Sequence, residues 1–191
     1  VRLDGGTELE ALRIDDDRVV LKLHSGSLGA RFGSRETVRE FELRTGEGSF
    51  RVNRTGRYRF DRHDETSQLT VYGGEAVYEG PRSALTVYSG QRAEFWIDAA
   101  GVAQYAVTDP LRDDFAGWNR ERDRADERNA SARYVSPEMT GVEDLDRYGR
   151  WQQDEDNGPV GVPREVSPGC APYSTGDWAW VAPWGWTRVD E

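Results

Sequence analysis

Apolar and polar side chains alternate with a period of two along several short segments in the first hundred residues. The apolar positions of these segments are Phe41 and Leu43, Phe50 and Val52, Tyr58 and Phe60, and Ala93, Phe95 and Ile97. A single apolar face at this period is typical of half-buried antiparallel strands. Breaks that contain glycine, such as Thr45–Gly48, separate the segments and suit tight hairpin turns. The pattern predicts a mainly β domain built from short antiparallel hairpins.

A short internal repeat supports this prediction. The segment Leu69–Tyr72 reads Leu-Thr-Val-Tyr, and the same four residues return at Leu85–Tyr88, sixteen positions later. Such a spacing accommodates two short strands with their turns, and stacked copies would bury a common apolar stripe. Two copies are fewer than the three or so that a solenoid needs. A solenoid-like stack and a β-sandwich therefore both remain open.

A helix that brackets the β domain is predicted near residues 109–128. Asp109 and the proline after it form a suitable helix start. Leu111, Phe115 and Trp118 then fall on one apolar stripe, and the residues beyond them are almost all charged. We expect the first part of this helix to pack on the core and the remainder to run into solvent.

Composition changes along the chain. The first 100 residues carry 15 cations and 17 anions, whereas the remaining 91 carry 10 and 18. Five of the seven tryptophans lie beyond residue 150, and six of the eight prolines lie beyond residue 136. We therefore predict an all-β domain at 1–107, a linking helix at 108–130 and a Trp/Pro/Gly-rich repeat region at 131–191. Within the last region a second helix is predicted over Val142–Tyr148, ended by Gly149.

The last region repeats a Gly-x-Trp element. Gly149 and Trp151 recur as Gly176 and Trp178, an offset of 27 residues, and the second copy stops in mid-pattern at Glu191. We therefore expect the natural protein to continue beyond this chain, and any signal segment to precede its first residue.

Several classes of function find no support in the sequence. No run of 18 apolar residues is present, so we expect no membrane span in this segment. The formal net charge of −10 makes nucleic acid an unsuitable partner, because such binding depends on neutralising phosphates. Cys170 is the single cysteine, so an internal disulfide is excluded.

Motifs for catalysis, cofactors or metals are equally scarce. His24 and His63 are the two histidines, and neither belongs to a nucleophile, zinc or nucleotide motif. We predict no enzyme and no cofactor. Asp154 and Asp156, before Asn157 and Gly158, are weak candidates for a calcium site. An ordinary Asp/Asn/Gly turn explains the same residues, and we predict no metal.

Aromatic residues of the last region are the main binding candidates. They are Trp151, Tyr173, Trp178, Trp180, Trp184 and Trp186. In an extended chain, rings two positions apart lie on one side and can stack on sugar faces or hold a proline-rich peptide. Tryptophan also buries much apolar surface, and the interpretation that we favour is that these rings form the core of the region.

The first part of the chain resembles FecR-like domains of the bacterial envelope. The segment Leu3–Thr7, which reads Leu-Asp-Gly-Gly-Thr, looks like their Leu-x-Asp-Gly-Ser/Thr opening. The other matching segments are Val20–Ser27, Phe41–Val52 and Gly56–Phe60. The last part, notably Ala132–Gly141 and Val181–Trp186, is similar to the Tyr/Trp/Pro-rich tail of uncharacterised proteins that carry a FecR-like domain.

The resemblance implies a β domain of the periplasm or cell surface with no catalytic residues. FecR proteins relay receptor occupancy to a sigma factor through a membrane helix, and neither that helix nor the anti-sigma segment is present in this sequence. We therefore expect a non-catalytic envelope module that binds protein partners or acts as a scaffold and can contribute to envelope signalling. The alternative is a module that binds cell-wall glycan through the tail tryptophans.

Overall fold

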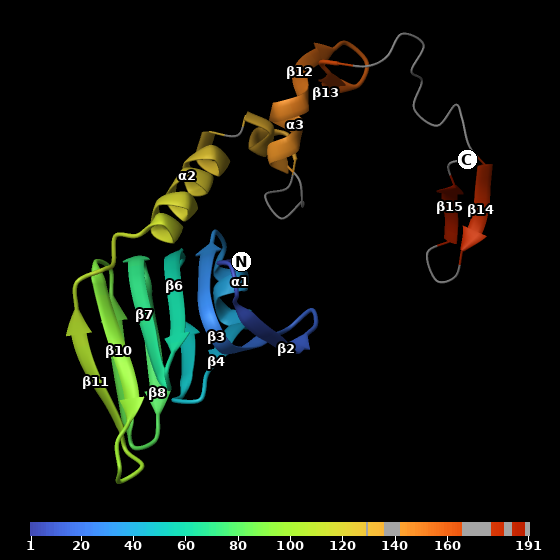
Figure 1. Ribbon diagram of the computed structural model, residues 1–191. Coiled ribbons are helices and arrows are strands. Elements are labelled where there is room, and N and C mark those ends of the chain that lie inside the picture. The colour runs from blue at the N-terminus through green and yellow to red at the C-terminus, as the bar shows by residue number, and fades with distance from the viewer. Residues whose placement is uncertain (129, 136–141, 166–176, 182–184, 190–191) are drawn as a thin grey trace. The chain divides into compact units, whose positions relative to one another are not determined.

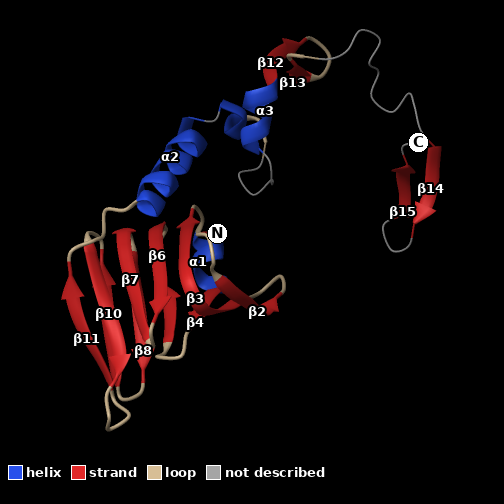
Figure 2. Ribbon diagram, in the orientation of Figure 1, coloured by secondary structure: helices blue, strands red, loops and turns tan. Residues whose placement is uncertain are grey.

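The computed structural model of the chain describes residues 1–128, 130–135, 142–165, 177–181 and 185–189. The described part is mainly β, as the sequence predicts (Figures 1 and 2). The chain divides into two compact units, Val1–Arg124 and Ala125–Glu191.

The first unit contains one sheet of eleven strands and two helices. The strands are β1 (Arg2–Leu3), β2 (Glu8–Ile14), β3 (Val19–Phe32), β4 (Phe41–Arg44), β5 (Ser49–Val52), β6 (Gly56–His63), β7 (Thr66–Gly73), β8 (Glu75–Gly80), β9 (Ser83–Tyr88), β10 (Gln91–Ile97) and β11 (Ala103–Thr108). Their order is β11-β10-β7-β6-β3-β4-β5-β8-β9, and β1 and β2 both pair with β3. Helix α1 (Arg35–Glu40) lies between β3 and β4 in the chain, and α2 (Asp114–Arg128) follows β11.

Strand β3 belongs to both halves of this sheet. Its first part, Val19–Lys22, pairs with β4, and its second part, Gly26–Phe32, pairs with β6. The chain bends between them at Gly26, whose φ of +95° lies in the region that favours glycine. The β3–β4 pair is parallel, which the prediction of antiparallel hairpins missed. A parallel pair needs a crossover, and α1 provides it.

The sheet curls so that its two halves face each other across one apolar core. Rings from β5 and β8 meet a ring of β10, although these strands are far apart in the sheet order. The centroids of Tyr78 and Phe95 are 3.8 Å apart, and those of Phe50 and Phe95 are 5.5 Å apart. All three side chains are fully buried. The eleven strands form one sheet that is curled almost into a barrel, so that two facing halves enclose the core without being two separate sheets.

The two copies of the Leu-Thr-Val-Tyr repeat lie in different halves of the sheet. One copy is in β7, which pairs with β6 and β10, and the other is in β9, which pairs with β8. They are therefore not successive rungs of a solenoid. Each copy supplies a leucine and a valine to the inner face, and Leu69, Val71 and Val87 are buried.

Helix α2 begins at Asp114, and its N-cap is Asp113, four residues after the predicted N-cap at Asp109. The carboxylate of Asp113 accepts the backbone N–H of Ala116 at 2.8 Å, so that Asp113 caps the helix. Leu111 precedes the helix and is exposed, and Trp118 is 41% exposed, so the predicted apolar stripe is reduced to Phe115.

The second unit contains short elements. They are the 3-10 helix η1 (Ala130–Arg133), α3 (Val142–Tyr148), and the hairpins of β12 (Gly149–Asp154) with β13 (Gly158–Pro163) and of β14 (Asp177–Val181) with β15 (Gly185–Val189). The prediction of a helix over Val142–Tyr148 is confirmed, and Gly149 begins the next strand.

We predict that Phe95→Ala lowers the free energy of unfolding of the first unit by about 3–5 kcal/mol, because the cavity left between the two halves of the sheet cannot close. Trp96→Ala is the matched control, since Trp96 is the next residue of β10 and its side chain is 37% exposed. The control should cost about 1 kcal/mol or less. Urea unfolding of the two variants measures both values, and equal losses would contradict this description of the core.

Candidate functional site

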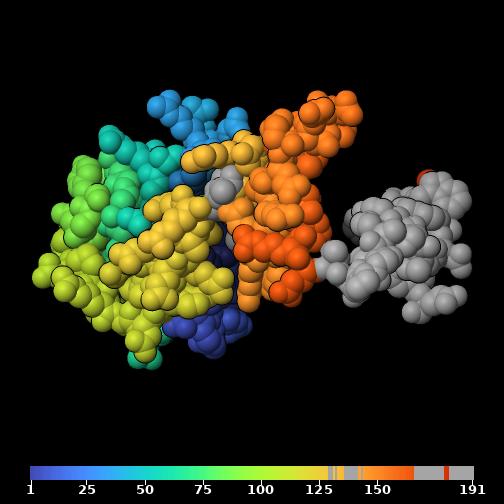
Figure 3. Space-filling view, turned by 90° about the horizontal axis from the view of Figure 1, so that it is seen from above, coloured from blue at the N-terminus to red at the C-terminus, as the bar shows by residue number. Residues whose placement is uncertain are grey.

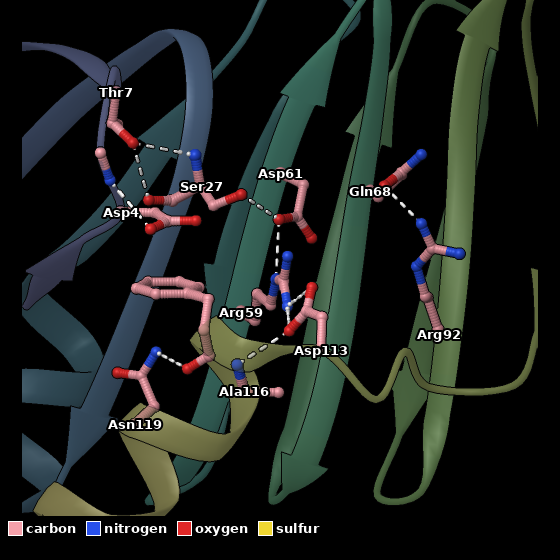
Figure 4. Close-up of polar contacts among 12 residues, drawn as sticks. Asp4, Thr7, Ser27, Arg59, Asp61, Gln68, Arg92, Asp113, Ala116 and Asn119 are labelled. Carbon is pink, nitrogen blue, oxygen red and sulfur yellow. Dashed lines mark hydrogen bonds and ion pairs between the residues drawn. The ribbon is translucent and has the colours of Figure 1, made fainter.

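A polar cluster joins α2 to the sheet, and all of its members except Asp113 are buried. It contains Ser27 of β3, Arg59 and Asp61 of β6, and Asp113 at the start of α2 (Figure 4). These side chains lie on the face of the sheet opposite the apolar core, where the alternation of β6 places polar residues between the buried Tyr58 and Phe60. Space-filling Figure 3 shows α2, in yellow, against the strands of this unit.

Arg59 is the central residue of this cluster. Its Nε donates to Asp61 Oδ1 at 2.7 Å, and its Nη1 donates to both carboxylate oxygens of Asp113 at 2.7 Å. Burial by itself lowers the pKa of the Arg59 guanidinium, but the two carboxylates outweigh burial and raise it. Arg59 is therefore a permanent cation that fixes the start of α2 over β6, and Ser27 also donates to Asp61 Oδ1, at 2.6 Å.

The approach of α2 to β3 depends on a glycine. A Cβ atom built at Gly29 would lie 2.6 Å from Oδ1 of Asn119, closer than real Cβ contacts. Arg2 of β1 also holds this part of the helix, since its Nη1 donates to Asp123 Oδ1 at 2.6 Å. The helix is therefore held on the polar face of the sheet in three places. Asp113, just before the helix, pairs with Arg59, Asn119 packs closely against Gly29, and Asp123 pairs with Arg2.

A second buried ion pair lies at the β4–β5 turn. Oε1 of Glu47 accepts Nη2 of Arg62 at 2.9 Å, and Oε2 accepts Nε of Arg62 at 3.1 Å and the hydroxyl of Ser67. Burial alone would raise the pKa of the Glu47 carboxyl, but these hydrogen bonds and the arginine charge outweigh it and hold that pKa below its ordinary value. This pair fastens the β4–β5 turn to β6 and β7.

Strand β11 presents an edge to which a further strand can be added. It lies at one end of the sheet order, and among the described strands only β10 pairs with it. An edge strand carries main-chain N–H and C=O groups that point away from the sheet. Natural edges are commonly protected by charged residues, yet the ten residues from Ala99 to Thr108 carry no charge in a chain that is 31% charged.

Apolar side chains of β11 extend the inner face of the sheet beyond the core. The register places Tyr105 opposite Phe95 and Val107 opposite Ala93. Residues opposite each other in an antiparallel pair lie on the same face. Phe95 and Ala93 are fully buried, whereas Tyr105 is 45% exposed and Val107 is 52% exposed. At its first residue the edge is already occupied, since the backbone N–H of Ala103 donates to the carbonyl of Pro81 at 2.9 Å. Beyond Ala103, the edge offers apolar surface and main-chain groups that pair with no described strand other than β10.

The structure separates the aromatic residues predicted as binding candidates. Trp151 is half-buried in the second unit: its indole N–H donates to the hydroxyl of Ser131 at 2.7 Å, and its ring centroid lies 4.5 Å from that of Tyr134. Trp151 therefore has a packing role. Trp180 of β14 is 67% exposed.

For Trp178 and Trp186 the structure gives the backbone register in the β14–β15 hairpin. The register of the second hairpin pairs Trp180 with Trp186 and Trp178 with Arg188. Tyr173 and Trp184 lie outside the described residues.

The two weak calcium candidates, Asp154 and Asp156, belong to the turn of the β12–β13 hairpin. Oδ1 of Asp154 accepts the backbone N–H of Asp156 at 3.1 Å and that of Asn157 at 2.9 Å, and Gly158 has a φ of +76°. These are the features of an Asp/Asn/Gly turn. Within the described residues no group of three or more His, Cys, Asp or Glu side chains is arranged to hold a metal ion. None of the described helices is both long and apolar enough to cross a membrane.

Comparisons with known proteins give a partial match. A family of unknown function, DUF6600, matches residues 142–191, about a quarter of the chain. No curated protein matches the sequence.

Two solved structures of a candidate anti-sigma factor from Parabacteroides distasonis share similarity with the chain, each at 13% sequence identity. One has a TM-score of 0.47 and covers 61% of this chain, which spans 54% of that protein. The other has a TM-score of 0.44, with 86% and 93% covered. Similarity at this level does not bear on function.

The β11 edge was missed by reasoning from the sequence, although a signal was present. The uncharged run of ten residues before Asp109 marks it, and the sequence alone does not tell which strand ends the sheet. The polar cluster at Arg59 left no such signal, because its members are separated by up to 86 positions between Ser27 and Asp113.

The lowered pKa of Glu47 predicts a pH dependence of stability. In the unfolded chain the carboxyl has an ordinary pKa near 4.5, so the folded protein binds fewer protons in the acidic window below that value. The stabilisation is complete above pH 4.5 and is lost as the pH falls through the lower folded pKa. One such group changes the free energy of unfolding by at most about 1.4 kcal/mol per pH unit.

Glu47→Gln should therefore flatten the fall in stability across this acidic window, as measured by urea unfolding at a series of pH values. Glu79→Gln is the control, because Glu79 is 48% exposed in its pair with Arg51, and exposed pairs contribute about 0–1 kcal/mol. An unchanged slope in Glu47→Gln would contradict the assignment of this pH dependence to Glu47.

Proposed function

We propose that the chain is a non-catalytic module of the bacterial cell envelope, of the FecR-like type that its sequence resembles, and that it binds a protein partner through β11. The partner supplies an extended segment that pairs with the free edge of this strand. The observation that carries the proposal is the uncharged edge with exposed Tyr105 and Val107 on the inner face of the sheet. Strand addition of this kind obtains affinity from main-chain hydrogen bonds and specificity from alternate side chains.

The position of the edge suits this role. A partner strand beside β11 would place alternate side chains against Tyr105 and Val107 and would cover apolar surface that the opposite half of the sheet leaves open. The core and the Arg59 cluster hold the rest of the unit together, and β10 joins β11 to it along six paired residues. Scaffolding, or the relay of a signal across the envelope, would then depend on which partner strand is bound.

The probe for this proposal is a soluble ten-residue peptide of alternating valine and threonine with lysine at both ends. We predict that it slows hydrogen exchange of backbone amides in β11 and leaves the other described edge strands unchanged. Val107→Lys should weaken binding about tenfold, because a lysine on an edge strand disfavours pairing. Leu12→Lys is the control, since it adds the same charge at a 42% exposed position of β2 and should bind like the unmodified chain. Protection elsewhere, or equal binding by Val107→Lys, would contradict the proposal.

Binding of cell-wall glycan is the second candidate, and one observation favours it. Trp180 presents 67% of its surface to solvent, and its direct cross-strand neighbour in the β14–β15 hairpin is Trp186. Exposed indole rings offer an apolar face to the carbon-bound hydrogens of sugars.

We predict, if this second function holds, that peptidoglycan fragments change the intrinsic tryptophan fluorescence of the chain in a saturable manner. Trp180→Ala should lower the affinity about tenfold, because the stacking ring is lost. Trp118→Ala removes an exposed ring of α2, which is 41% exposed, and should leave the affinity unchanged. No saturable change, or an equal effect of both substitutions, would remove glycan binding from consideration.

A further inference from the structure

A small cavity between α2 and the polar face of the sheet is separate from both surfaces considered above. Its volume is about 230 Å³, and its lining residues are Arg57, Tyr72, Ala116, Asn119, Arg120 and Asp123. The size is below the roughly 300–1,000 Å³ typical of sites for drug-sized ligands. The cavity therefore fits a small ion or the end group of a longer molecule.

The charged groups of this cavity give it an excess of positive charge. Arg57 of β6 is half-buried and Arg120 of α2 is exposed, and neither forms an ion pair with another described residue. The one acidic residue of the lining, Asp123, is already paired with Arg2 at 2.6 Å. Two guanidinium groups thus remain available at the cavity of a chain whose overall net charge is −10.

Tyr72 provides a second and independent observation. Its hydroxyl is buried and forms no hydrogen bond of ordinary geometry with a described residue, although the Arg59 guanidinium lies close enough to act on its pKa. Buried polar groups in proteins are nearly always paired. Burial raises the pKa of the Tyr72 hydroxyl, so that it keeps its proton and is a hydrogen-bond donor at neutral pH. Asp61 and Thr70 also carry an unpaired buried oxygen, but neither residue lines the cavity.

Asparagine and arginine side chains complete the set of donors. The amide of Asn119 is positioned by its hydrogen bond to the carbonyl of Phe115, at 2.9 Å, and by its contact with Gly29. Planar guanidinium groups bind carboxylate and phosphate oxygens with two parallel hydrogen bonds. An oxyanion placed between the two arginines would accept from both and from the tyrosine hydroxyl.

We propose that this cavity is an anion-binding site, in which Arg57, Arg120 and the Tyr72 hydroxyl hold the oxygens of a carboxylate or phosphate group. The site lies on the face of the sheet that carries α2, and its ligand would connect strand β6 to the helix. Binding there is independent of strand addition at β11, so either proposal can fail without the other.

Two probes test the site in the full chain: inorganic phosphate, and acetylglycine as a free carboxylate. Titration is followed by the side-chain and backbone NMR signals of α2, β6 and β7 at constant ionic strength adjusted with chloride. We expect saturable shifts for at least one probe. A response to phosphate alone assigns the site to phosphate, and a response to acetylglycine alone assigns it to carboxylate.

Tyr72→Phe is the decisive variant, because it removes one hydroxyl from the cavity and keeps the ring. It should weaken binding about tenfold, as expected for loss of a hydrogen bond to a charged group. Tyr105→Phe is the matched control on exposed β11 and should bind like the unmodified chain. Arg57→Gln should also weaken binding at least about tenfold. Absence of saturation with both probes, or equal affinity in Tyr72→Phe, would overturn the proposal.

Discussion

The bend of β3 at Gly26 is the constraint on which the first unit depends. A Cβ atom at this position would lie within 2.9 Å of three atoms of Thr7, so a larger residue would push that segment away. The hydroxyl of Thr7 accepts the N–H of Ser27 at 3.0 Å and donates to its carbonyl at 3.1 Å, which closes the bend. Because one strand pairs with β4 before the bend and with β6 after it, the two halves of the sheet come face to face.

The same bend leads directly to the polar cluster. Ser27 follows Gly26 and donates to Asp61, which accepts from Arg59, which in turn holds Asp113 at the start of α2. Buried ion pairs contribute little net stability after desolvation, but breaking one leaves an unpaired buried charge. The cluster therefore fixes where the helix begins and over which strands it lies, and the walls of the cavity near Arg57 and Tyr72 follow from that placement.

The two sides of the sheet thus suit different ligands. The inner face ends in apolar, uncharged β11, where an extended protein segment can pair, and the outer face under α2 collects donors for an anion. This arrangement suits the module proposed above, which binds its protein partner through β11.

Local patterns in the sequence determined the β class, the positions of strands such as β4, β5, β6 and β10, and the short helix Val142–Tyr148, because alternation and glycine turns act over a few residues. Tertiary structure decided the parallel β3–β4 pair, the separation of the two repeat copies and the start of α2 at Asp114. It also decided that Tyr105 is exposed while Phe95 beside it is buried. Each of these features depends on contacts between strands or charged residues that are far apart in the sequence. The alternation of apolar and polar residues shows that a segment is a strand, but it does not specify the strand with which that segment pairs.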